Sequence, residues 1–186
     1  KGWEPMLMLG LDVYGKTLGI IGMGRIGQAV AKRATGFAMR IIYYNDVPVS
    51  NTLPFETTET DLQTLLKEAD IITLHLPLTK ETFHLIGKEE FALMKENAVL
   101  INTSRGAVID EKELIKALSE KRIFSAGLDV YENEPDIPQE LLALENVVLL
   151  PHIGSASIET RTKMALLAAE NAIAVMEGRK PPAQVN

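Results

Sequence analysis

The sequence predicts an α/β fold built on a parallel sheet with helices on both faces. Six short apolar segments alternate along the chain with stretches of helical periodicity. These segments are apolar throughout instead of alternating with polar residues, which is typical of parallel strands covered on both faces. A turn with three glycines joins the first segment to a helix. Together these observations predict a doubly wound sheet.

The glycine turn gives the first indication of function. The predicted strand 17–21 runs directly into Gly22-Met23-Gly24-Arg25-Ile26-Gly27 and the start of a helix. Gly22 permits the tight turn, Gly24 lets the backbone approach a pyrophosphate, and Gly27 lets the helix pack closely on the strand. The backbone N–H groups at the helix start then face the phosphates. We interpret the turn as a dinucleotide site; the alternative is a glycine turn with a purely structural role.

The second strand, 40–44, ends at a candidate ribose ligand. Asp46 lies 19 residues after Gly27, close to the spacing expected for a carboxylate that binds the adenosine ribose hydroxyls. No Lys or Arg lies between Arg40 and Lys67, and Asp46 would repel a 2′-phosphate. NAD is therefore favoured over NADP. The alternative is that Asp46 only begins a turn before Pro48.

Four further strands are predicted at 71–76, 98–102, 123–128 and 146–150. With the first two they make two strand–helix–strand–helix–strand halves, which predicts a Rossmann sheet ordered 3-2-1-4-5-6. We expect residues 1–186 to form a single dinucleotide-binding domain.

The helices are predicted from their capping residues. Thr60, with Gln63 at the third helical position, indicates a helix that ends near Ala69, and Asp110 with Glu113 begins another. A closing helix is expected from about Ser157 to Glu177, followed by Gly178 as the residue after its C-cap. Its predicted apolar stripe consists of Ile158, Ala165, Ala169, Ala172 and Met176.

Composition excludes several classes of function. The net charge of −6 argues against a nucleic-acid surface, and no apolar run approaches the roughly 18 residues that a membrane helix needs. With no cysteine and three scattered histidines, neither disulfides nor a metal site is expected. No signal peptide is visible, so a cytoplasmic location is the default expectation.

Three polar residues follow consecutive predicted strands. Arg105, Glu134 and His152 come after the fourth, fifth and sixth strands, and the carboxyl ends of parallel strands form the ligand edge of such a sheet. An imidazole there can give a proton to a developing alkoxide, and a carboxylate can favour the imidazolium. A guanidinium can hold a substrate carboxylate through two parallel hydrogen bonds. The trio predicts reduction of a carbonyl by hydride.

Each of these residues also has a structural interpretation. Arg105 could form a surface or interdomain ion pair, Glu134 competes with Glu132 for its role, and His152 could be a helix-entry residue. The other two histidines are interpreted as structural: His75 and His84.

The chain resembles the coenzyme-binding domain of the D-2-hydroxyacid dehydrogenase family, and within it most resembles the glyoxylate/hydroxypyruvate reductases. The resemblance spans nearly the whole chain in the family's order. The stretches that carry it are 14–22, the glycine turn, 75–79, 101–106, 127–130, Glu134-Pro135 and 151–154.

This resemblance implies roles for individual residues. His152 is the implied acid/base, Glu134 its partner and Arg105 the anchor of the substrate carboxylate. For the cofactor, the implied contacts are Asp129 with the nicotinamide carboxamide, Thr103 near the nicotinamide, and the backbone N–H groups of Arg25 and Ile26 with the pyrophosphate. One departure is that the family's carboxylate for NAD often falls where Asn45 stands, with Asp46 one place on.

The family's enzymes also carry a substrate-covering lobe, and this chain contains neither of its parts. We expect 1–10 and 179–186 to be truncated connections to that lobe, and the chain itself to bind NAD(H) with little turnover because its cleft stays wet. The resemblance further implies a homodimer formed through this domain. Trp3, Pro5, Met6, Met8 and Leu9 make an apolar opening segment that is costly to expose.

Three functions stay open. The first is NADH-linked reduction of a small 2-keto acid, such as glyoxylate or hydroxypyruvate, to the D-2-hydroxy acid by a parent enzyme. The second is an NAD(H)-responsive interaction module, like the corepressors that resemble the same family. The third is a formate- or phosphite-type dehydrogenase, which the missing lobe would decide.

Overall fold

The computed structural model describes residues 9–47, 49 and 53–184. The chain divides into two compact units, Lys1–His152 and Ile153–Asn186, and each is treated by itself. All the site residues predicted from the sequence lie in the first, which we call unit 1. The predicted opening segment lies outside the described residues except for Leu9, whose side chain is exposed.

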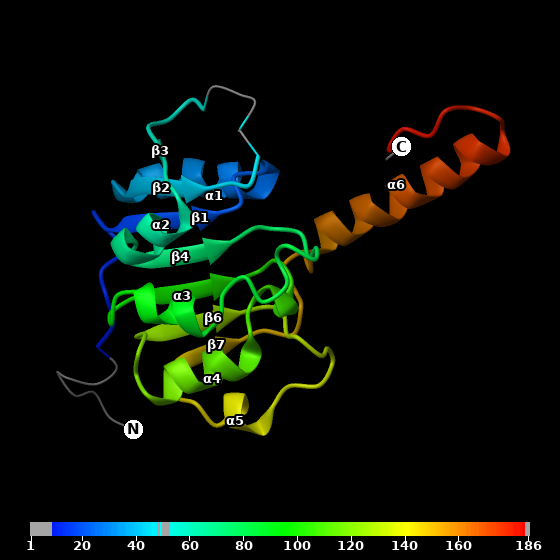
Figure 1. The fold of residues 1–186 in the computed structure, drawn as a ribbon. Helices are drawn as coiled ribbons and strands as arrows, with labels where there is room; N and C mark the ends of the chain where they lie inside the picture. The colour runs from blue at the N-terminus through cyan, green and yellow to red at the C-terminus, as the bar shows by residue number, and fades with distance from the viewer. Residues whose placement is uncertain (1–8, 48, 50–52, 185–186) are drawn as a thin grey trace. The chain divides into compact units, whose positions relative to one another are not determined.

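Unit 1 is built on a seven-stranded, all-parallel sheet in the order β3-β2-β1-β4-β5-β6-β7 (Figure 1). This confirms the predicted parallel α/β class. The strands are β1 (Thr17–Ile21), β2 (Arg40–Tyr44), β3 (Thr58–Glu59), β4 (Ile71–Leu74), β5 (Val99–Asn102), β6 (Ser125–Leu128) and β7 (Val147–Leu149). The chain leaves β1 toward β2 and later returns to the other side of β1 as β4, so the strand order reverses between β1 and β4. Ligands of open α/β sheets bind at such a switch point.

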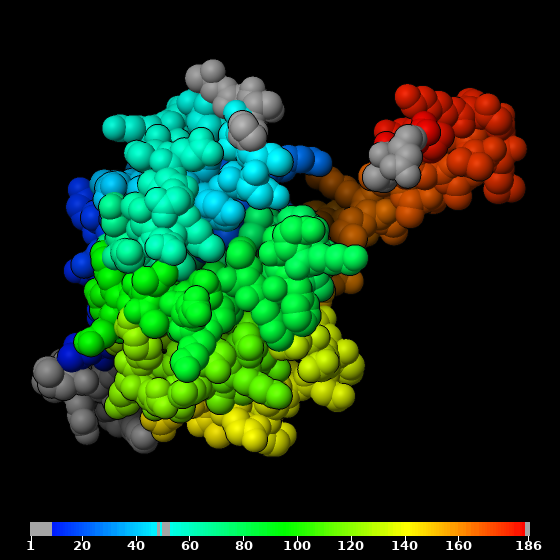
Figure 2. Space-filling model, viewed as in Figure 1, coloured from blue at the N-terminus to red at the C-terminus, as the bar shows by residue number. Residues whose placement is uncertain are grey.

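The helices divide between the two faces of the sheet. The first face is covered by α1 (Arg25–Ala34), whose Ala31 and Ala34 pack on Leu18, Ile20 and Ile41. The other face carries α2 (Leu62–Glu68), α3 (Lys88–Leu93) and α4 (Glu111–Ser119), which lie in a row in front of the sheet in Figure 1. In the space-filling view this row forms a continuous surface (Figure 2). Short elements complete the unit: the 3-10 turns η1 (Thr35–Phe37) and η2 (Gly106–Val108), and α5 (Gln139–Leu142).

Local chemistry explains where these helices begin and how closely they pack. Asp61 caps α2 by accepting a hydrogen bond from the Thr64 N–H, and Asp110 caps α4 by accepting from the N–H groups of Lys112 and Glu113. Gly19 leaves room for α2, because a Cβ there would stand 2.7 Å from Leu65 Cδ2. A larger residue in β1 would push the helix away from the sheet.

Two sequence-based predictions are corrected here. The six-strand order placed segment 71–76 outside segment 40–44, but β4 pairs with β1, and the two-residue β3 takes the outer position. β3 has no apolar residue, so its sequence carries no strand pattern. Thr60 is not the N-cap of α2, since Asp61 holds that position.

The prediction that both faces of every strand are covered is also wrong for part of the sheet. β1 and β2 are almost wholly buried, whereas burial alternates with partial exposure along β5 and β6. In β7, Val148 is 64% exposed. Among the described residues of unit 1, the core cluster on the α1 face takes residues from β1 and β2 together with Ile71 of β4, and none from β5, β6 or β7.

The second unit contains one long helix, α6 (Ile158–Met176). It agrees with the predicted range of about Ser157 to Glu177: Ser157 is its N-cap and accepts from the Thr160 N–H, and Gly178 follows the C-cap with φ +67°, as predicted. The predicted apolar stripe is not buried within this unit, because Ala174 is the buried residue of α6. No helix in the described part of the chain is long and apolar enough to cross a membrane.

Candidate functional site

The glycine turn after β1 is fixed by close backbone contacts. Gly22 has φ +99° and donates its N–H to the Tyr44 carbonyl at 2.9 Å. A Cβ on Gly22 would lie 2.8 Å from the His75 carbonyl, and one on Gly27 would lie 2.2 Å from the Gly22 carbonyl oxygen. A Cβ on Gly24, in contrast, would meet nothing within 4 Å. Two of the three glycines are therefore required by the fold, and the third borders open space.

The N-terminus of α1 has the properties of an anion site. Gly24 is the N-cap and supplies no side-chain cap, and no acidic residue lies in the first turn. The first N–H groups of a helix have no partner within it, and the helix dipole favours negative charge there. The side chains of Arg25 and Ile26 are exposed, so their backbone N–H groups belong to an open helix end. Such a helix end could hold an anion such as a diphosphate.

The end of β2 is tied to the same turn. Asn45 Oδ1 accepts a hydrogen bond from the Met23 N–H at 2.8 Å, and its amide donates to the Val47 carbonyl at 2.6 Å. Asn45 therefore holds the turn in place, while the neighbouring Asp46 is exposed. Of the two residues that the sequence left as candidates for the ribose, Asp46 alone has a carboxylate, and it is exposed, whereas both polar atoms of the Asn45 side chain are engaged within the turn.

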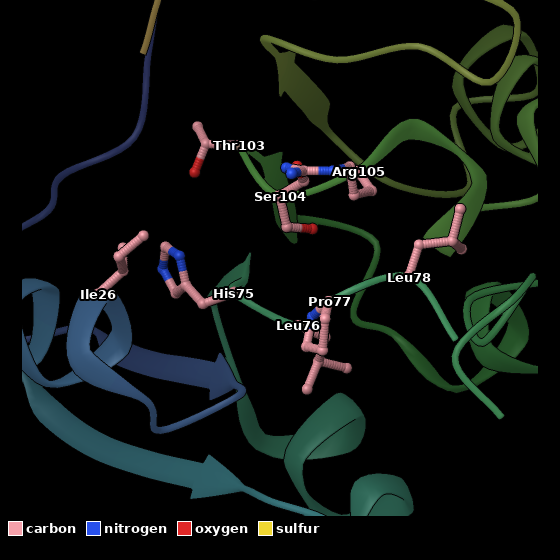
Figure 3. Close-up of a pocket in the computed structure, with 8 residues that line it drawn as sticks. All are labelled: Ile26, His75, Leu76, Pro77, Leu78, Thr103, Ser104 and Arg105. Carbon is pink, nitrogen blue, oxygen red and sulfur yellow. The ribbon is translucent and has the colours of Figure 1, made fainter. Parts of the chain in front are cut away.

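A cavity of about 380 Å³ opens beside the helix end, at the carboxyl edge of the sheet. Its lining residues come from α1 and from the loops after β4 and β5: Ile26, His75, Leu76, Pro77, Leu78, Thr103, Ser104 and Arg105. Figure 3 shows His75 beside Ile26, with the loop of Thr103, Ser104 and Arg105 across from them. His75 Nε2 lies 3.0 Å from Thr73 Oγ1, and burial lowers the pKa of its imidazole. His75 is interpreted as structural from the sequence, yet it borders this cavity.

The loop after β5 is organised by a buried asparagine. Asn102 donates to the Arg105 carbonyl at 2.9 Å and accepts from both the N–H and the hydroxyl of Ser104. One guanidinium nitrogen of Arg105 donates to the Ser104 carbonyl at 2.7 Å. A Cβ on Gly106 would lie 1.9 Å from the Tyr131 carbonyl, so this loop lies directly against the loop after β6. The local contacts thus place Arg105 beside the segment that carries Glu134.

Glu134 and His152 form a hydrogen-bonded pair. His152 Nδ1 lies 2.7 Å from Glu134 Oε2, while Glu134 Oε1 accepts from the Tyr131 N–H at 3.0 Å. The hydrogen bond with His152, the Tyr131 N–H and the charge of Arg105 outweigh desolvation and lower the pKa of the Glu134 carboxyl. His152 has φ +54°, a backbone conformation that residues other than glycine adopt at a cost and that often occurs at functional sites. The pair is open, with His152 55% and Glu134 34% exposed.

The contacts distinguish Glu134 from its neighbour Glu132. Glu132 Oε1 lies 3.1 Å from His84 Nε2, so its partner is a different histidine. Asp129, also a predicted site residue, is buried at the end of β6, and its N–H donates to the Asn102 carbonyl at 3.0 Å.

Two residues of this region were missed in the sequence. Asn102 is a buried polar residue that shapes the Arg105 loop. Tyr131 connects both members of the pair: its N–H binds Glu134, and its hydroxyl donates to the Leu150 carbonyl at 2.8 Å, two residues before His152. Burial raises the pKa of the Tyr131 hydroxyl. Asn102 stands at the end of an apolar run and Tyr131 lies between Val130 and Glu132, and neither position by itself indicates which polar contact the residue makes.

Nothing in the described part of the chain resembles a metal centre, because no three His, Asp or Glu side chains there are grouped to hold an ion. The chemistry available at this edge is therefore that of an anion-binding helix end, a carboxylate–imidazole pair and a guanidinium. Their arrangement suits a nucleotide lying across the edge with its reactive end near His152.

Comparison with known protein families identifies the domain. Residues 1–154 match the family described as D-isomer specific 2-hydroxyacid dehydrogenase, NAD binding domain. The chain is 58% identical, over its full length, to a glyoxylate reductase of Thermococcus litoralis, of which it covers 56%. It thus spans little more than half the length of that relative.

Solved structures give the same result. A protein of Thermus thermophilus superposes with a TM-score of 0.93 at 51% identity, over all of this chain and 58% of its own. An NADPH-dependent glyoxylate/hydroxypyruvate reductase of Sinorhizobium meliloti, in complex with NADP and malonate, superposes with a TM-score of 0.83 at 37% identity. That match covers 88% of this chain and 51% of the reductase.

Proposed function

Since the chain belongs to the D-isomer specific 2-hydroxyacid dehydrogenase family, as its NAD-binding domain, we propose that it is the coenzyme half of a glyoxylate reductase-type enzyme. Such an enzyme transfers a hydride from NADH to a small 2-keto acid and forms the D-2-hydroxy acid. The observation that carries this proposal is the 2.7 Å contact between His152 and Glu134. It lies at the same sheet edge as the anion-binding end of α1.

The residues of unit 1 fit a dinucleotide. The backbone N–H groups of Arg25 and Ile26 would hold the diphosphate, with Gly24 giving it room, since a Cβ there meets no protein atom within 4 Å. Thr103 and Asp129 would hold the nicotinamide end. The bound nicotinamide supplies the hydride acceptor or donor, a chemistry that no side chain provides.

The remaining side chains would serve the substrate. Arg105 would bind its carboxylate through two parallel hydrogen bonds from Nε and one terminal nitrogen, while the other terminal nitrogen keeps its bond to the Ser104 carbonyl. His152 would donate a proton from Nε2 to the oxygen of the carbonyl, because its Nδ1 is engaged by Glu134. Glu134 would stabilise the charged imidazole and fix its orientation.

We propose NAD rather than NADP as the coenzyme. Asp46 is the exposed carboxylate next to the turn, where it would accept from both ribose hydroxyls. A 2′-phosphate at this position would meet a negative charge and no cation between residues 41 and 66. A relative with the same fold is NADPH-dependent, so the preference depends on this local charge.

We further propose that this chain by itself turns over slowly. His152 is 55% exposed, and an exposed site screens the charges that stabilise a transition state. A chain that covers 56% of its Thermococcus relative leaves the substrate side of the cleft to other segments.

The experiment is an assay of NADH oxidation on glyoxylate, with this chain and with a longer chain that contains it. We expect NADH binding by both and rapid turnover by the longer chain alone. His152→Gln in the longer chain should lower kcat by roughly 10² to 10⁴ while NADH affinity is kept. A longer chain that binds NADH but reduces no small keto acid would contradict the enzyme and favour an NAD(H)-responsive interaction module.

We also propose that the chain forms a homodimer through this domain. Support comes from exposed apolar residues at the end of its opening segment and just after it, Leu9, Leu11 and Val13, since a protein rarely leaves a large apolar patch open to water. Analytical ultracentrifugation should report a dimer, and a monomer at all concentrations would contradict the proposal.

A further inference from the structure

His84 connects the loop after β4 to the loop after β6. Its Nε2 lies 3.1 Å from Glu132 Oε1, and its Nδ1 lies 3.6 Å from Asp110 Oδ2 at the start of α4. The ring stacks on Phe83 with centroids 3.9 Å apart. His84 has φ +51°, so the backbone adopts an unfavourable conformation that directs the ring toward Glu132.

Backbone contacts show that His84 is firmly held on its own side. Its N–H donates to the Ala107 carbonyl at 2.8 Å, and the Ile86 N–H donates to the Val108 carbonyl at 3.1 Å. The loop after β4 is therefore paired with η2, the turn that follows Arg105. The imidazole extends from this fixed base to a loop that has few such anchors.

On the other side of the contact, Glu132 lies two residues before Glu134. Its second oxygen accepts from the Glu111 N–H at 3.4 Å, and the Glu132 N–H donates to the Glu111 carboxylate at 3.4 Å. Both bonds are long, so the contact with His84 is the shortest that the Glu132 side chain makes in the described structure. Displacement of Glu132 would move the Tyr131 N–H and the Glu134 carboxylate that it binds.

We propose that His84 is a positioning residue: by holding Glu132, it fixes the 131–134 segment and so sets the Glu134 carboxylate against His152. The catalytic consequence rests on the function proposed above, whereas the positioning itself does not. His84 is not one of the residues that line the cavity, so it acts through the loop.

The charged groups around His84 come from two elements besides its own loop. Asp110 and Glu111 begin α4, and Glu132 follows β6. Burial raises the pKa of the Glu111 carboxyl, and the nearby Glu132 charge adds to the rise. A variant at His84 therefore changes the electrostatics of these carboxylates as well as one hydrogen bond, and the test has to separate the two effects.

The test measures the titration of the Glu134 carboxyl by carbon NMR in this chain, without substrate. In the unsubstituted chain, the hydrogen bond with His152 lowers its pKa. In His84→Leu we expect that pKa to rise toward the ordinary value of a glutamate, because the carboxylate moves from His152. In His84→Gln, the amide can still donate to Glu132, so the Glu134 pKa should stay close to that of the unsubstituted chain.

Asp110→Asn is the matched control. It removes a charge beside His84 but keeps the cap of α4, because asparagine is an equally good N-cap, and it leaves the His84–Glu132 contact in place. The Glu134 titration should then stay as in the unsubstituted chain. An equal rise of the Glu134 pKa in Asp110→Asn and His84→Leu would overturn the proposal, since the effect would then be electrostatic and would not depend on the His84–Glu132 contact.

Glu132→Ala breaks the same contact from its other side and serves if His84→Leu fails to fold. An unchanged Glu134 titration in a folded His84→Leu or Glu132→Ala chain would also overturn the proposal. In a longer, active chain, His84→Leu should lower kcat roughly tenfold with an unchanged KM for NADH. Absence of turnover in the unsubstituted enzyme would refute the proposed function and leave the NMR result standing.

Discussion

The two halves of the sheet edge differ in how completely this chain builds them. On the coenzyme side, β1 and β2 are covered by α1 and α2 on opposite faces, and hydrogen bonds from the Gly22 and Met23 N–H groups hold the glycine turn. On the catalytic side, β5, β6 and β7 are covered on one face, and His152 and Glu134 are open to solvent.

Because of this difference, we expect coenzyme binding and catalysis to depend on this chain to different extents. A diphosphate site made of backbone N–H groups needs only the turn and the helix, and both are rigidly packed in this chain. Proton transfer and charge stabilisation need a dry site, which the catalytic side lacks in unit 1. We therefore expect a chain that binds its coenzyme well and reacts slowly.

The largest expected effect is on the free energy of unfolding, and it compares one substitution in each half of the sheet. Ile20 in β1 is fully buried, whereas Val148 in β7 is 64% exposed. Ile20→Ala should cost about 2–5 kcal/mol of unfolding free energy, and Val148→Ala about 0.5 kcal/mol or less. Urea titrations followed by circular dichroism measure both. A cost for Val148→Ala near that for Ile20→Ala would contradict the comparison, because the β7 face would then be covered in solution.

A pair of glycine variants sharpens the comparison within the coenzyme side. Gly27→Ala places a methyl group 2.2 Å from the Gly22 carbonyl, and we expect about 1–3 kcal/mol of destabilisation with loss of NADH binding. Gly24→Ala meets no protein atom and should cost only about 0.5–1 kcal/mol, because alanine is a poorer N-cap than glycine.

The two variants differ in what calorimetry with NADH reports. Gly24→Ala should weaken NADH binding by roughly tenfold or more in a fully folded protein, because its methyl group occupies space meant for the diphosphate. Tight NADH binding by Gly24→Ala would refute the placement of that diphosphate.

The next largest effect is on the preference for NAD over NADP. Asp46→Ala should reduce the ratio of NAD to NADP affinity by roughly tenfold, since about 1.4 kcal/mol of carboxylate contact and repulsion is removed. Asn45→Ala should weaken both coenzymes alike, because Asn45 holds the Met23 N–H of the turn. Fluorescence titration with NADH and NADPH distinguishes these results, and the opposite pattern would assign the ribose to Asn45.

The smallest effect concerns an ion pair far from the site. Asp70 accepts from Lys95 Nζ at 2.7 Å and from the Thr17 N–H at 2.9 Å. Burial alone would raise the pKa of its carboxyl, but these bonds outweigh it and lower the pKa. Asp70→Asn should cost about 1 kcal/mol with NADH affinity unchanged.

The pH dependence of that cost has a definite sign. A carboxyl with a lowered folded-state pKa stabilises the fold above the pKa of the unfolded chain, and this stabilisation is lost as pH falls through the folded value. The difference in melting temperature between the unsubstituted chain and the Asp70→Asn variant should therefore shrink in acid. A difference that grows in acid would contradict the assignment.

The strands were predictable because apolar runs such as 17–21 and 71–74 indicate buried segments. β3 was not, since Thr58 and Glu59 are both exposed and pair with β2 through their backbone alone. Its absence from the prediction left an outer position that β4 was wrongly given. The uneven cover of the sheet could not be predicted either. An apolar strand such as β5 does not reveal from its sequence whether one face or both faces are covered within unit 1.

For the site, position after a strand was the useful signal. It located Arg105, Glu134 and His152 by their place at one edge, although their roles stay predictions. It could not choose between Glu132 and Glu134, because both lie in one loop and only the side-chain contacts separate them. Asn102 acts through contacts with Ser104 and Arg105 in its own loop, and the Tyr131 hydroxyl reaches the Leu150 carbonyl of another loop; the residue types alone do not indicate these partners.

The central claim is that a nicotinamide coenzyme lies across this edge with its diphosphate at the start of α1. The most direct measurement is a crystal structure of the chain grown with NAD. We predict phosphate oxygens within hydrogen-bond distance of the Arg25 and Ile26 N–H groups, and the adenosine ribose beside Asp46. Coenzyme density at any other place on the molecule, with the glycine turn empty, would contradict the account.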